Sequence, residues 1–360
     1  MLGERGEVTF TVTIILTMNN PLQNYNPNDV GQINGNIFGL PFDYDSANLI
    51  IIPIPWEVTV SYGAGTAKAP QRILDASPQL DLFDFDNPDG WKQGIFMMEI
   101  PQDILDKNQY YRQQAATIIE RQELGKSLSE APDLTSLLSE INQACENVNK
   151  WLFDKSQQAI NDGKRVAVIG GDHSSPLGYM QALAENYSNY GILHVDAHAD
   201  LRNAYEGFEF SHASIMYNAM KLPQISKLVQ VGLRDICQDE VEMINQSDGR
   251  IIAYYDPIIK QKQYSGTTWI DLCKEIVSHL PEYVYISFDV DGLDPKLCPN
   301  TGTPVPGGLE LEQAFCLVRE VVKSGRKIIG FDLCEVGDAE WDANVGARVV
   351  LKLAYLMDLS

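Results

Sequence analysis

Seven short apolar runs rich in β-branched residues recur along this chain from residue 49 onward, and they constrain its fold more than any other feature. Runs of this length and composition are typical of strands that are buried on both faces. The runs are 49–54, 165–169, 191–195, 228–231, 250–254, 283–288 and 327–331. Helix-like stretches lie between several of them, at about 134–160, 176–186, 268–279 and 310–323. Strands that alternate with helices predict an α/β fold with a mainly parallel sheet and helices on both of its faces.

The layout of the chain predicts one catalytic domain at 46–360, preceded by an N-terminal arm at 1–45. The arm is rich in Asn, Pro, Gly and Gln, a loop-like composition, and we expect it to cover an edge or to contact a neighbouring subunit. Residues 83–133 are polar and rich in turns, and we interpret them as an insertion or lid. The apolar patch Val8–Leu16 is too short to span a bilayer and lacks a positive flank, so neither a membrane span nor a signal peptide is expected. Met18 is an alternative to Met1 as the translation start.

Charge and cysteine usage exclude other classes of protein. The formal net charge is −22 and no basic run appears, which argues against nucleic acid as a partner and favours a small cation. The six cysteines are widely spaced and form no CxxC pair. We therefore expect reduced cysteines and a cytoplasmic protein.

Polar side chains follow three of the apolar runs, at the edge of a parallel sheet where ligands bind. Gly170–Ser175 follows the run 165–169, Asp196–Asp200 follows 191–195, and Asp289–Pro295 follows 283–288. Alternate side chains of an extended backbone point to one face, so an Asp-x-His-x-Asp run brings three potential ligands together. One such run alone is more often a solvated loop, but three polar segments directly after apolar strands favour a metal site.

The predicted site contains two imidazoles and four carboxylates. They belong to His173, Asp196, His198, Asp200, Asp289 and Asp291. Four negative charges cannot be buried without cations. One divalent ion would leave the site with net negative charge. Two divalent metal ions would neutralise it, with some carboxylates bridging the two ions. Oxygen ligands with a minority of nitrogen suit manganese or a similar ion better than zinc alone.

Two metal ions lower the pKa of a bridging water and provide a hydroxide near neutral pH. The sequence contains no Ser-His-Asp arrangement and no nucleophilic cysteine signature, so direct attack by water is the simplest mechanism. The leaving amine also needs an acid. His212 is the candidate, and a surface histidine is the alternative interpretation at that position.

The three polar segments resemble the signatures of the ureohydrolases, the arginase and agmatinase family. Gly170–Ser174, Asp196–Asp200 and Ser287–Pro295 carry the resemblance, and Thr301–Pro304 and Gly307–Leu309 match the segment that follows the third signature. The resemblance runs from about residue 48 to the end. It implies a three-layer α/β/α arginase-like fold, two metals that are usually manganese, and a homo-oligomer, either a trimer or a hexamer.

The resemblance also implies roles for single residues. One metal would be held by His173, Asp196, Asp200 and Asp289, and the other by Asp196, His198, Asp289 and Asp291, so that Asp196 and Asp289 bridge. The catalytic set would be His212 as the proton shuttle, Glu335 as the acceptor of the guanidinium group, and Asp200, which is also a ligand. His194 is expected to support or pack against the ligands, and His279 to lie at the surface.

The chain departs from the common pattern at several positions. Arg202 stands where arginases place an Asn that holds the amino-acid end of the substrate, and Gly337-Asp338 stands where Asn-Pro is common. Together with the N-terminal arm at 1–45 and the insertion at 83–133, these changes make the chain similar to the cyanobacterial guanidine-hydrolase branch. That similarity implies guanidine as the substrate, urea and ammonia as products, a preference for nickel, and metal-delivery accessory proteins as potential partners. Agmatine or guanidinobutyrate is the alternative substrate, and a catalytically silent scaffold is disfavoured because the site is complete.

Overall fold

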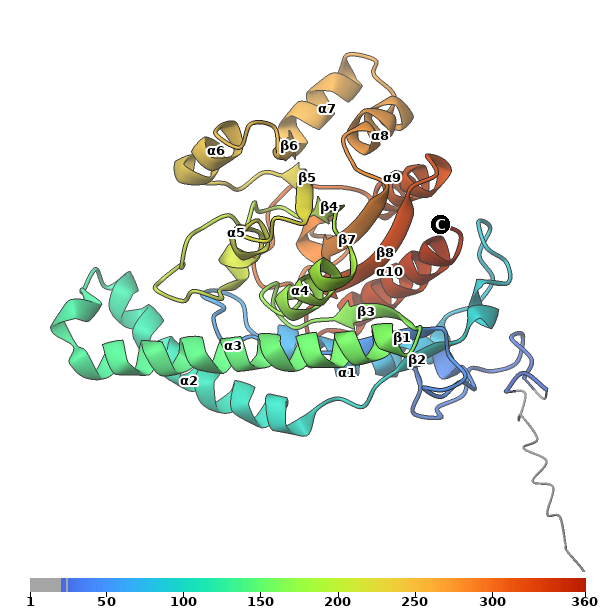
Figure 1. Cartoon of the computed structure of the whole chain (residues 1–360), viewed down its shortest axis with the longest axis horizontal. Helices are drawn as coiled ribbons and strands as arrows, with labels where there is room; N and C mark the ends of the chain where they lie inside the picture. Colours follow the sequence, from blue (N-terminus) through green and yellow to red (C-terminus); the bar gives the residue numbers. More distant parts are fainter. Residues whose placement is uncertain (1–20, 24) are drawn as a thin grey trace, which may run out of the picture.

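The core of the chain is one sheet of eight parallel strands in a computed structural model that describes residues 21–23 and 25–360 (Figure 1). The strands are β1 (Leu49–Pro53), β2 (Ile95–Met97), β3 (Arg165–Ile169), β4 (Tyr190–Val195), β5 (Ile225–Leu233), β6 (Ile251–Tyr255), β7 (Tyr283–Asp289) and β8 (Lys327–Cys334). Their order in the sheet is β2-β1-β3-β8-β7-β4-β5-β6, and every neighbouring pair is parallel. The seven expected strands and the parallel sheet are confirmed.

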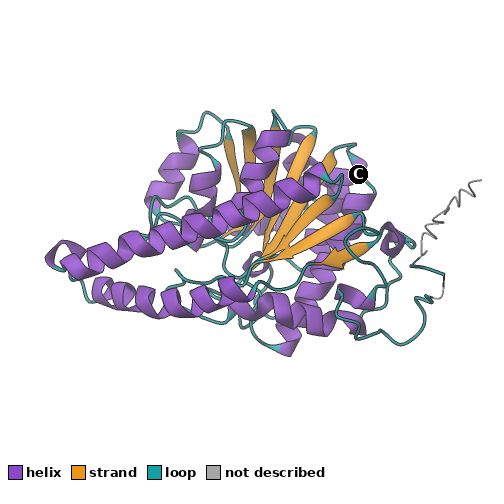
Figure 2. Ribbon diagram, turned by 60° about the horizontal axis from the view of Figure 1, so that its bottom comes forward, coloured by secondary structure: helices purple, strands orange, loops and turns teal. Residues whose placement is uncertain are grey.

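Two rows of helices cover the sheet, which confirms the three-layer α/β/α architecture (Figure 2). One row contains α1 (Ala69–Ala76), α10 (Glu340–Asp358), α9 (Leu311–Lys323) and α8 (Trp269–Ser278), and the other contains α3 (Pro132–Asn161), α4 (Leu177–Asn186) and α5 (Ile215–Ala219). The remaining α-helices are α2 (Gln102–Glu123), α6 (Gln238–Asn245) and α7 (Asp256–Tyr264). Short 3₁₀ helices are η1 (Ile37–Gly39), η2 (Thr66–Lys68), η3 (Ser77–Gln79), η4 (Gly90–Gln93), η5 (Leu128–Glu130), η6 (His212–Ser214) and η7 (Val290–Gly292).

The four helix-like stretches expected from the sequence are present as α3, α4, α8 and α9, whereas α10 was not expected. The start of α8 is fixed by Thr268, whose hydroxyl accepts a hydrogen bond from the backbone N–H of Asp271 at 3.2 Å. In contrast, α10 is buried along most of its length, so its sequence lacks the one-sided pattern that indicates an amphipathic helix. No helix in the described ranges is both long and apolar enough to cross a membrane.

The stretch expected as an insertion at 83–133 contributes to the central sheet. Its strand β2 pairs with β1, with Ile95 opposite Leu49, and forms one edge of the sheet. Three residues are too few to show a periodic pattern, which is why the sequence did not reveal this strand. The rest of the segment includes α2, which packs against α3 in a long helical hairpin at one side of the domain (Figures 1 and 2).

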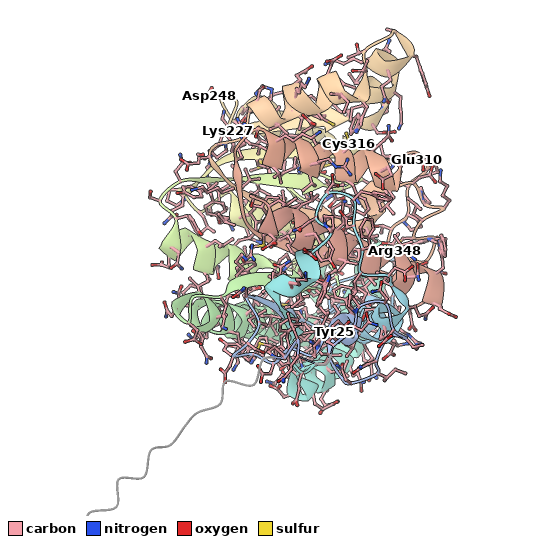
Figure 3. The ribbon with its side chains drawn as sticks, turned by 90° about the vertical axis from the view of Figure 1, so that its right-hand side faces the viewer. Tyr25, Lys227, Asp248, Glu310, Cys316 and Arg348 are labelled. Carbon is pink, nitrogen blue, oxygen red and sulfur yellow. The ribbon has the colours of Figure 1, made fainter. Side chains whose placement is uncertain are left out.

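The described part of the N-terminal arm covers the β2 edge of its own chain. The side-chain amide of Asn36 donates a hydrogen bond to the carbonyl of Ile95 at 3.0 Å, and its oxygen accepts one from the N–H of Met97 at 3.0 Å. Asn36 thus takes the place of a further strand at an edge that would otherwise expose unpaired groups. Figure 3 shows Tyr25 of the arm toward this end of the molecule, and Lys227 toward the other. The apolar patch Val8–Leu16 and Met18 lie outside the described residues.

The sheet order determines where a site can form. β3 and β4 follow one another along the chain, yet β8 and β7 lie between them in the sheet. The carboxyl ends of these four central strands therefore meet, although they come from distant parts of the sequence. Ligands of open α/β sheets bind at such a switch in strand order.

Candidate active site

The three polar segments at the strand ends are built on the same local turn. In each, an aspartate carboxylate accepts a hydrogen bond from the backbone N–H two residues further on. This bond takes the place of the hydrogen bonds between strands, which stop where the strand ends. The pairs, from carboxylate Oδ1 to backbone N, are Asp172 to Ser174 at 3.0 Å, Asp196 to His198 at 2.6 Å, and Asp289 to Asp291 at 2.8 Å. Each turn uses only one of the two carboxylate oxygens of its aspartate.

Four of the residues predicted as metal ligands converge at one point. The Nδ1 atom of His173, after β3, lies 3.0 Å from Oδ2 of Asp196 and 3.2 Å from Oδ2 of Asp200, both after β4. It also lies 3.2 Å from Oδ2 of Asp289, at the end of β7. All four side chains are buried.

The other two predicted ligands adjoin this point and share Asp196 with it. Nδ1 of His198 lies 3.0 Å from Oδ2 of Asp291 and 3.5 Å from Oδ1 of Asp196. Potential ligand atoms of Asp196, His198 and Asp291 lie within 4.8 Å of one another. The structure thus brings all six residues together in two adjoining groups, and Asp196 belongs to both.

Crowding of buried carboxylates perturbs the proton equilibria of the site. Burial, together with the charge of Asp196, raises the pKa of Asp200 to about 6. Burial and the charges of Asp291 and Asp196 raise the pKa of Asp289 well above its usual range. Burial alone would also raise the pKa of Asp196, but His194, His173 and His198 hold it well below its usual range. Such a cluster needs positive charge, and its mixture of oxygen and nitrogen atoms fits two divalent cations.

His173 is supported from behind by two residues that sequence reasoning missed. Its Nε2 atom lies 2.9 Å from Oγ of Ser287 on β7 and 3.7 Å from Oδ1 of Asp332 on β8. Asp332 is fully buried and accepts a hydrogen bond from the hydroxyl of Tyr285 at 2.6 Å. The sequence held one signal for Asp332, which directly follows the apolar run 327–331. The strand continues through Asp332 to Cys334, and a carboxylate within a buried strand needs a partner.

Glu335 follows β8 and presents one oxygen without a partner. Its Oε1 accepts a hydrogen bond from the backbone N–H of His173 at 3.0 Å, whereas its buried Oε2 has no hydrogen-bond partner among the described residues. A Cβ atom at position 302 would lie 2.8 Å from Oε2, so the glycine there keeps this oxygen accessible. Burial and the charge of Asp172 raise the pKa of Glu335 well above its usual range. The backbone of Glu335 is left-handed, with φ of 63°, a strained conformation for a residue other than glycine.

His212 begins the short helix η6 and lies in the wall of the same cavity. Its backbone N–H donates to Oγ of Thr59 at 3.4 Å, and its ring stands edge-on to that of Tyr205, with centroids 6.2 Å apart. Burial, followed by the positive charges of His198 and His173, lowers the pKa of His212 to about 4. The ring is thus placed where a neutral imidazole can exchange protons with a bound molecule.

A small cavity of about 160 Å³ joins these groups. Its lining includes His173, His198, Asp200, Asp289, Asp291, Glu335, His212, Arg202, Tyr205, Asp235, Glu240, Ser61, Thr303 and Ala213. The guanidinium of Arg202 lies 4.9 Å from the centre of the Tyr205 ring, and its Nε lies 3.9 Å from Oε2 of Glu240. Larger hollows of about 920 and 540 Å³ lie elsewhere and contain none of the six predicted ligands.

Side-chain amides hold the loop that carries Tyr205 and leads to His212. Gln122 of α2 donates to the carbonyl of Glu206 at 2.7 Å. Asn142 of α3 donates to the carbonyl of Gly207 at 3.2 Å and accepts from the N–H of Glu209 at 2.9 Å. The helical hairpin α2–α3 therefore fixes one wall of the cavity.

A parallel α/β sheet whose central strand ends gather two histidines and four aspartates is typical of a hydrolase with a two-metal centre. The sequence profile of the arginase family matches residues 47–357. The chain therefore belongs to the arginase family. It is a ureohydrolase, a hydrolase of guanidino C–N bonds with a binuclear divalent metal centre.

Relatives and solved structures agree with this assignment. The chain is 28% identical over 293 residues to N(1)-aminopropylagmatine ureohydrolase of Thermus thermophilus, covering 81% of this chain and 84% of that protein. It is 33% identical over 228 residues to agmatinase of Sodalis glossinidius, covering 62% of this chain and 68% of that protein. The structure of agmatine ureohydrolase of Thermoplasma volcanium shares the fold, with a TM-score of 0.66, 21% identity and coverage of 88% and 92% of the two chains.

Proposed function

We propose that this ureohydrolase cleaves guanidine itself to urea and ammonia. The observation that carries the proposal is the unpaired, buried Oε2 of Glu335, whose side chain lines the same small cavity as five of the six predicted metal ligands. A carboxylate is the natural partner of a planar guanidinium group, to which it can bind through two parallel hydrogen bonds. Few other ligands would suit an anionic oxygen beside a cluster of aspartates.

The proposed roles follow from position in the cavity. His173, Asp196, Asp200 and Asp289 hold one divalent cation, and Asp196, His198, Asp289 and Asp291 hold the second. When bound, the two cations supply water that is activated for attack near neutral pH.

The other groups act on the substrate. Glu335 accepts hydrogen bonds from guanidinium N–H groups and so orients the central carbon toward the cluster. His212 takes up the proton that the attacking water gives up and passes it to the nitrogen that leaves as ammonia.

Cavity size favours guanidine over longer substrates. Sites that bury drug-sized ligands measure about 300–1,000 Å³, whereas this cavity measures about 160 Å³. Arg202 and Tyr205 stack on one another in its wall, where they take up room that a substrate tail would need. A guanidinium ion without a tail requires no such room.

An alkylguanidine such as agmatine or guanidinobutyrate is the second candidate. Its support comes from the names of the relatives, which include agmatinase and N(1)-aminopropylagmatine ureohydrolase. The carboxylates of Asp235 and Glu240 also line the cavity and could attract a cationic tail.

Urea release from the purified chain separates the two candidates. We expect guanidine to give a higher kcat/KM than agmatine or guanidinobutyrate at equal metal loading, because guanidine has no tail that must be accommodated beside Arg202. The panel is measured after loading with Ni²⁺ and, in parallel, with Mn²⁺, and we expect nickel to support the higher rate. Faster turnover of agmatine would overturn guanidine as the substrate and leave the ureohydrolase assignment intact.

Loosening the loop that leads to His212 is expected to lower kcat/KM while the chain remains folded. Replacing Asn142 by Ala removes its hydrogen bonds to Gly207 and Glu209, which should cost about 1–3 kcal/mol of folding stability in total. We expect kcat/KM to fall about tenfold or more, because small displacements of catalytic groups are costly. Asn147, exposed on the same helix, provides the matched Asn→Ala control. Unchanged kinetics for Asn142→Ala would show that the loop keeps its position without this contact.

A further inference from the structure

His194 contacts Asp196 of the six-residue cluster and takes part in a buried hydrogen-bond network. Its side chain belongs to β4 and stands opposite Gln230 of β5 in the sheet register. Both residues have no exposed surface. A histidine in this position is close enough to the cluster to be a metal ligand, since its ring nitrogen lies within 4.8 Å of potential ligand atoms of His173, Asp196 and Asp200.

We propose instead that His194 is a positioning residue, which donates a hydrogen bond from Nε2 to Asp196 and is held in that tautomer by Gln230. The inference rests on the proposed function only in assigning Asp196 as the ligand shared by two metal ions. It adds a pair of residues, His194 and Gln230, that would set the orientation of this carboxylate.

Three distances define the network. Nε2 of His194 lies 2.8 Å from Oδ2 of Asp196. Nε2 of Gln230 lies 2.9 Å from Nδ1 of His194 and 2.7 Å from the carbonyl oxygen of Ala199. The network thus runs from β5 through β4 to the carboxylate that both groups of the cluster share.

The carbonyl of Ala199 fixes the orientation of the Gln230 amide. A carbonyl oxygen can only accept hydrogen bonds, so the group 2.7 Å from it must be the NH₂ of Gln230 and not its oxygen. The opposite orientation would bring two oxygens together. The same NH₂ group therefore faces Nδ1 of His194.

The fixed amide in turn determines the state of the His194 ring. Because an N–H of Gln230 points at Nδ1, this nitrogen must carry a lone pair and accept the hydrogen bond. In the neutral ring the proton then resides on Nε2, which donates it to Asp196. A protonated Nε2 has no lone pair for a metal ion, so His194 cannot serve as a ligand without breaking the network.

The network has a consequence for metal binding. One hydrogen bond from His194 fixes the direction of Oδ2 of Asp196 and leaves the negative charge of the carboxylate in place. Partners that orient a metal ligand in this way typically contribute about 10–100-fold to metal affinity or activity.

Affinity for Mn²⁺ tests the role directly, and is measured by calorimetric titration of the full chain after removal of bound metal. We expect His194→Phe to weaken Mn²⁺ binding about 10–100-fold while the number of sites stays the same. We expect His194→Gln to recover most of the affinity, because its amide N–H can reach the position of Nε2. His279→Phe, at the residue that follows α8, is the matched histidine control and should bind Mn²⁺ as the unmodified chain does.

Two results of this titration would overturn the proposal. Loss of one Mn²⁺ equivalent in both His194→Phe and His194→Gln would identify His194 as a ligand. Lower thermal stability with unchanged Mn²⁺ affinity would mean that the residue only fills space in the core.

The tautomer itself can be observed without any substrate. In the full chain labelled with ¹⁵N-histidine, the side-chain resonances that disappear in His194→Phe belong to His194. We expect them to report the neutral Nε2–H form in the metal-free chain and after addition of diamagnetic Zn²⁺. An imidazolium, an Nδ1–H ring or a coordinated Nε2 would refute the proposal. A chain that shows the Nε2–H form but binds no metal would refute the proposed function and leave the hydrogen-bond network standing.

Discussion

Replacing Asp291 by Ala is expected to abolish turnover, with a loss of kcat of at least about 10³-fold. Activation of water by a two-metal centre lowers the barrier by several kcal/mol, and each 1.4 kcal/mol corresponds to about a factor of ten in rate. Asp291 is buried, and its carboxylate contacts Nδ1 of His198 at 3.0 Å and the backbone N–H of Ala197 at 3.0 Å. Its removal should reduce the bound metal from two equivalents to about one, as measured by elemental analysis of the purified variant.

Asp294 offers a matched control in the same loop. Its carboxylate is partly exposed, accepts the backbone N–H of Lys296 at 3.0 Å and does not line the cavity. Asp294→Ala should therefore retain both metal equivalents and near-normal turnover. Full activity in Asp291→Ala would contradict the assignment of this residue as a ligand and the two-metal mechanism with it.

Replacing Glu335 by Gln should weaken catalysis while leaving metal binding unchanged. The amide keeps an oxygen that can accept the N–H of His173, so the turn after β8 should persist. At the position of Oε2, however, an NH₂ group would face the N–H groups of the substrate, and a charge-assisted interaction of about 1.5–3 kcal/mol would be lost. We expect kcat/KM for guanidine to fall by about 10- to 10²-fold.

The kinetic comparison needs a second measurement to separate substrate binding from damage to the metal centre. Two bound metal equivalents in Glu335→Gln, with the loss confined to the kinetic constants, would support the proposed role. Glu340→Gln, exposed at the start of α10, is the matched control for loss of a carboxylate. If Glu335→Gln turned over guanidine like the unmodified chain, Glu335 would not be the group that receives the guanidinium.

The chemistry of the cluster could be predicted from the sequence because it depends on neighbours along the chain. The Asp-x-His-x-Asp run and the Asp289–Asp291 pair place their ligands by turns that span two residues, which is a local property, although neither run is the extended strand that the sequence led us to expect. The apolar runs likewise indicated seven of the strands, because each buried strand shows itself in its own composition.

Features that depend on the order of the strands could not be predicted in this way. Asp332 and Ser287 support His173 only because β8 and β7 lie between β3 and β4, and no local pattern specifies that order. The strand β2 was too short to detect, and the segment around it looked like an insertion. Its pairing with β1 and the cover provided by Asn36 involve residues far apart in the chain.

The sequence by itself therefore determined the class of fold, the six-residue cluster and the hydrolytic chemistry, since the apolar runs and the polar segments directly after them are local features of the chain. Only the tertiary structure decided how the cluster is enclosed. It placed the unpaired oxygen of Glu335 and the ring of His212 in one small cavity, and it gave His194 a donor role through Gln230. These features arise from contacts between strands and loops that are distant in sequence, and such contacts form only when the whole sheet is assembled.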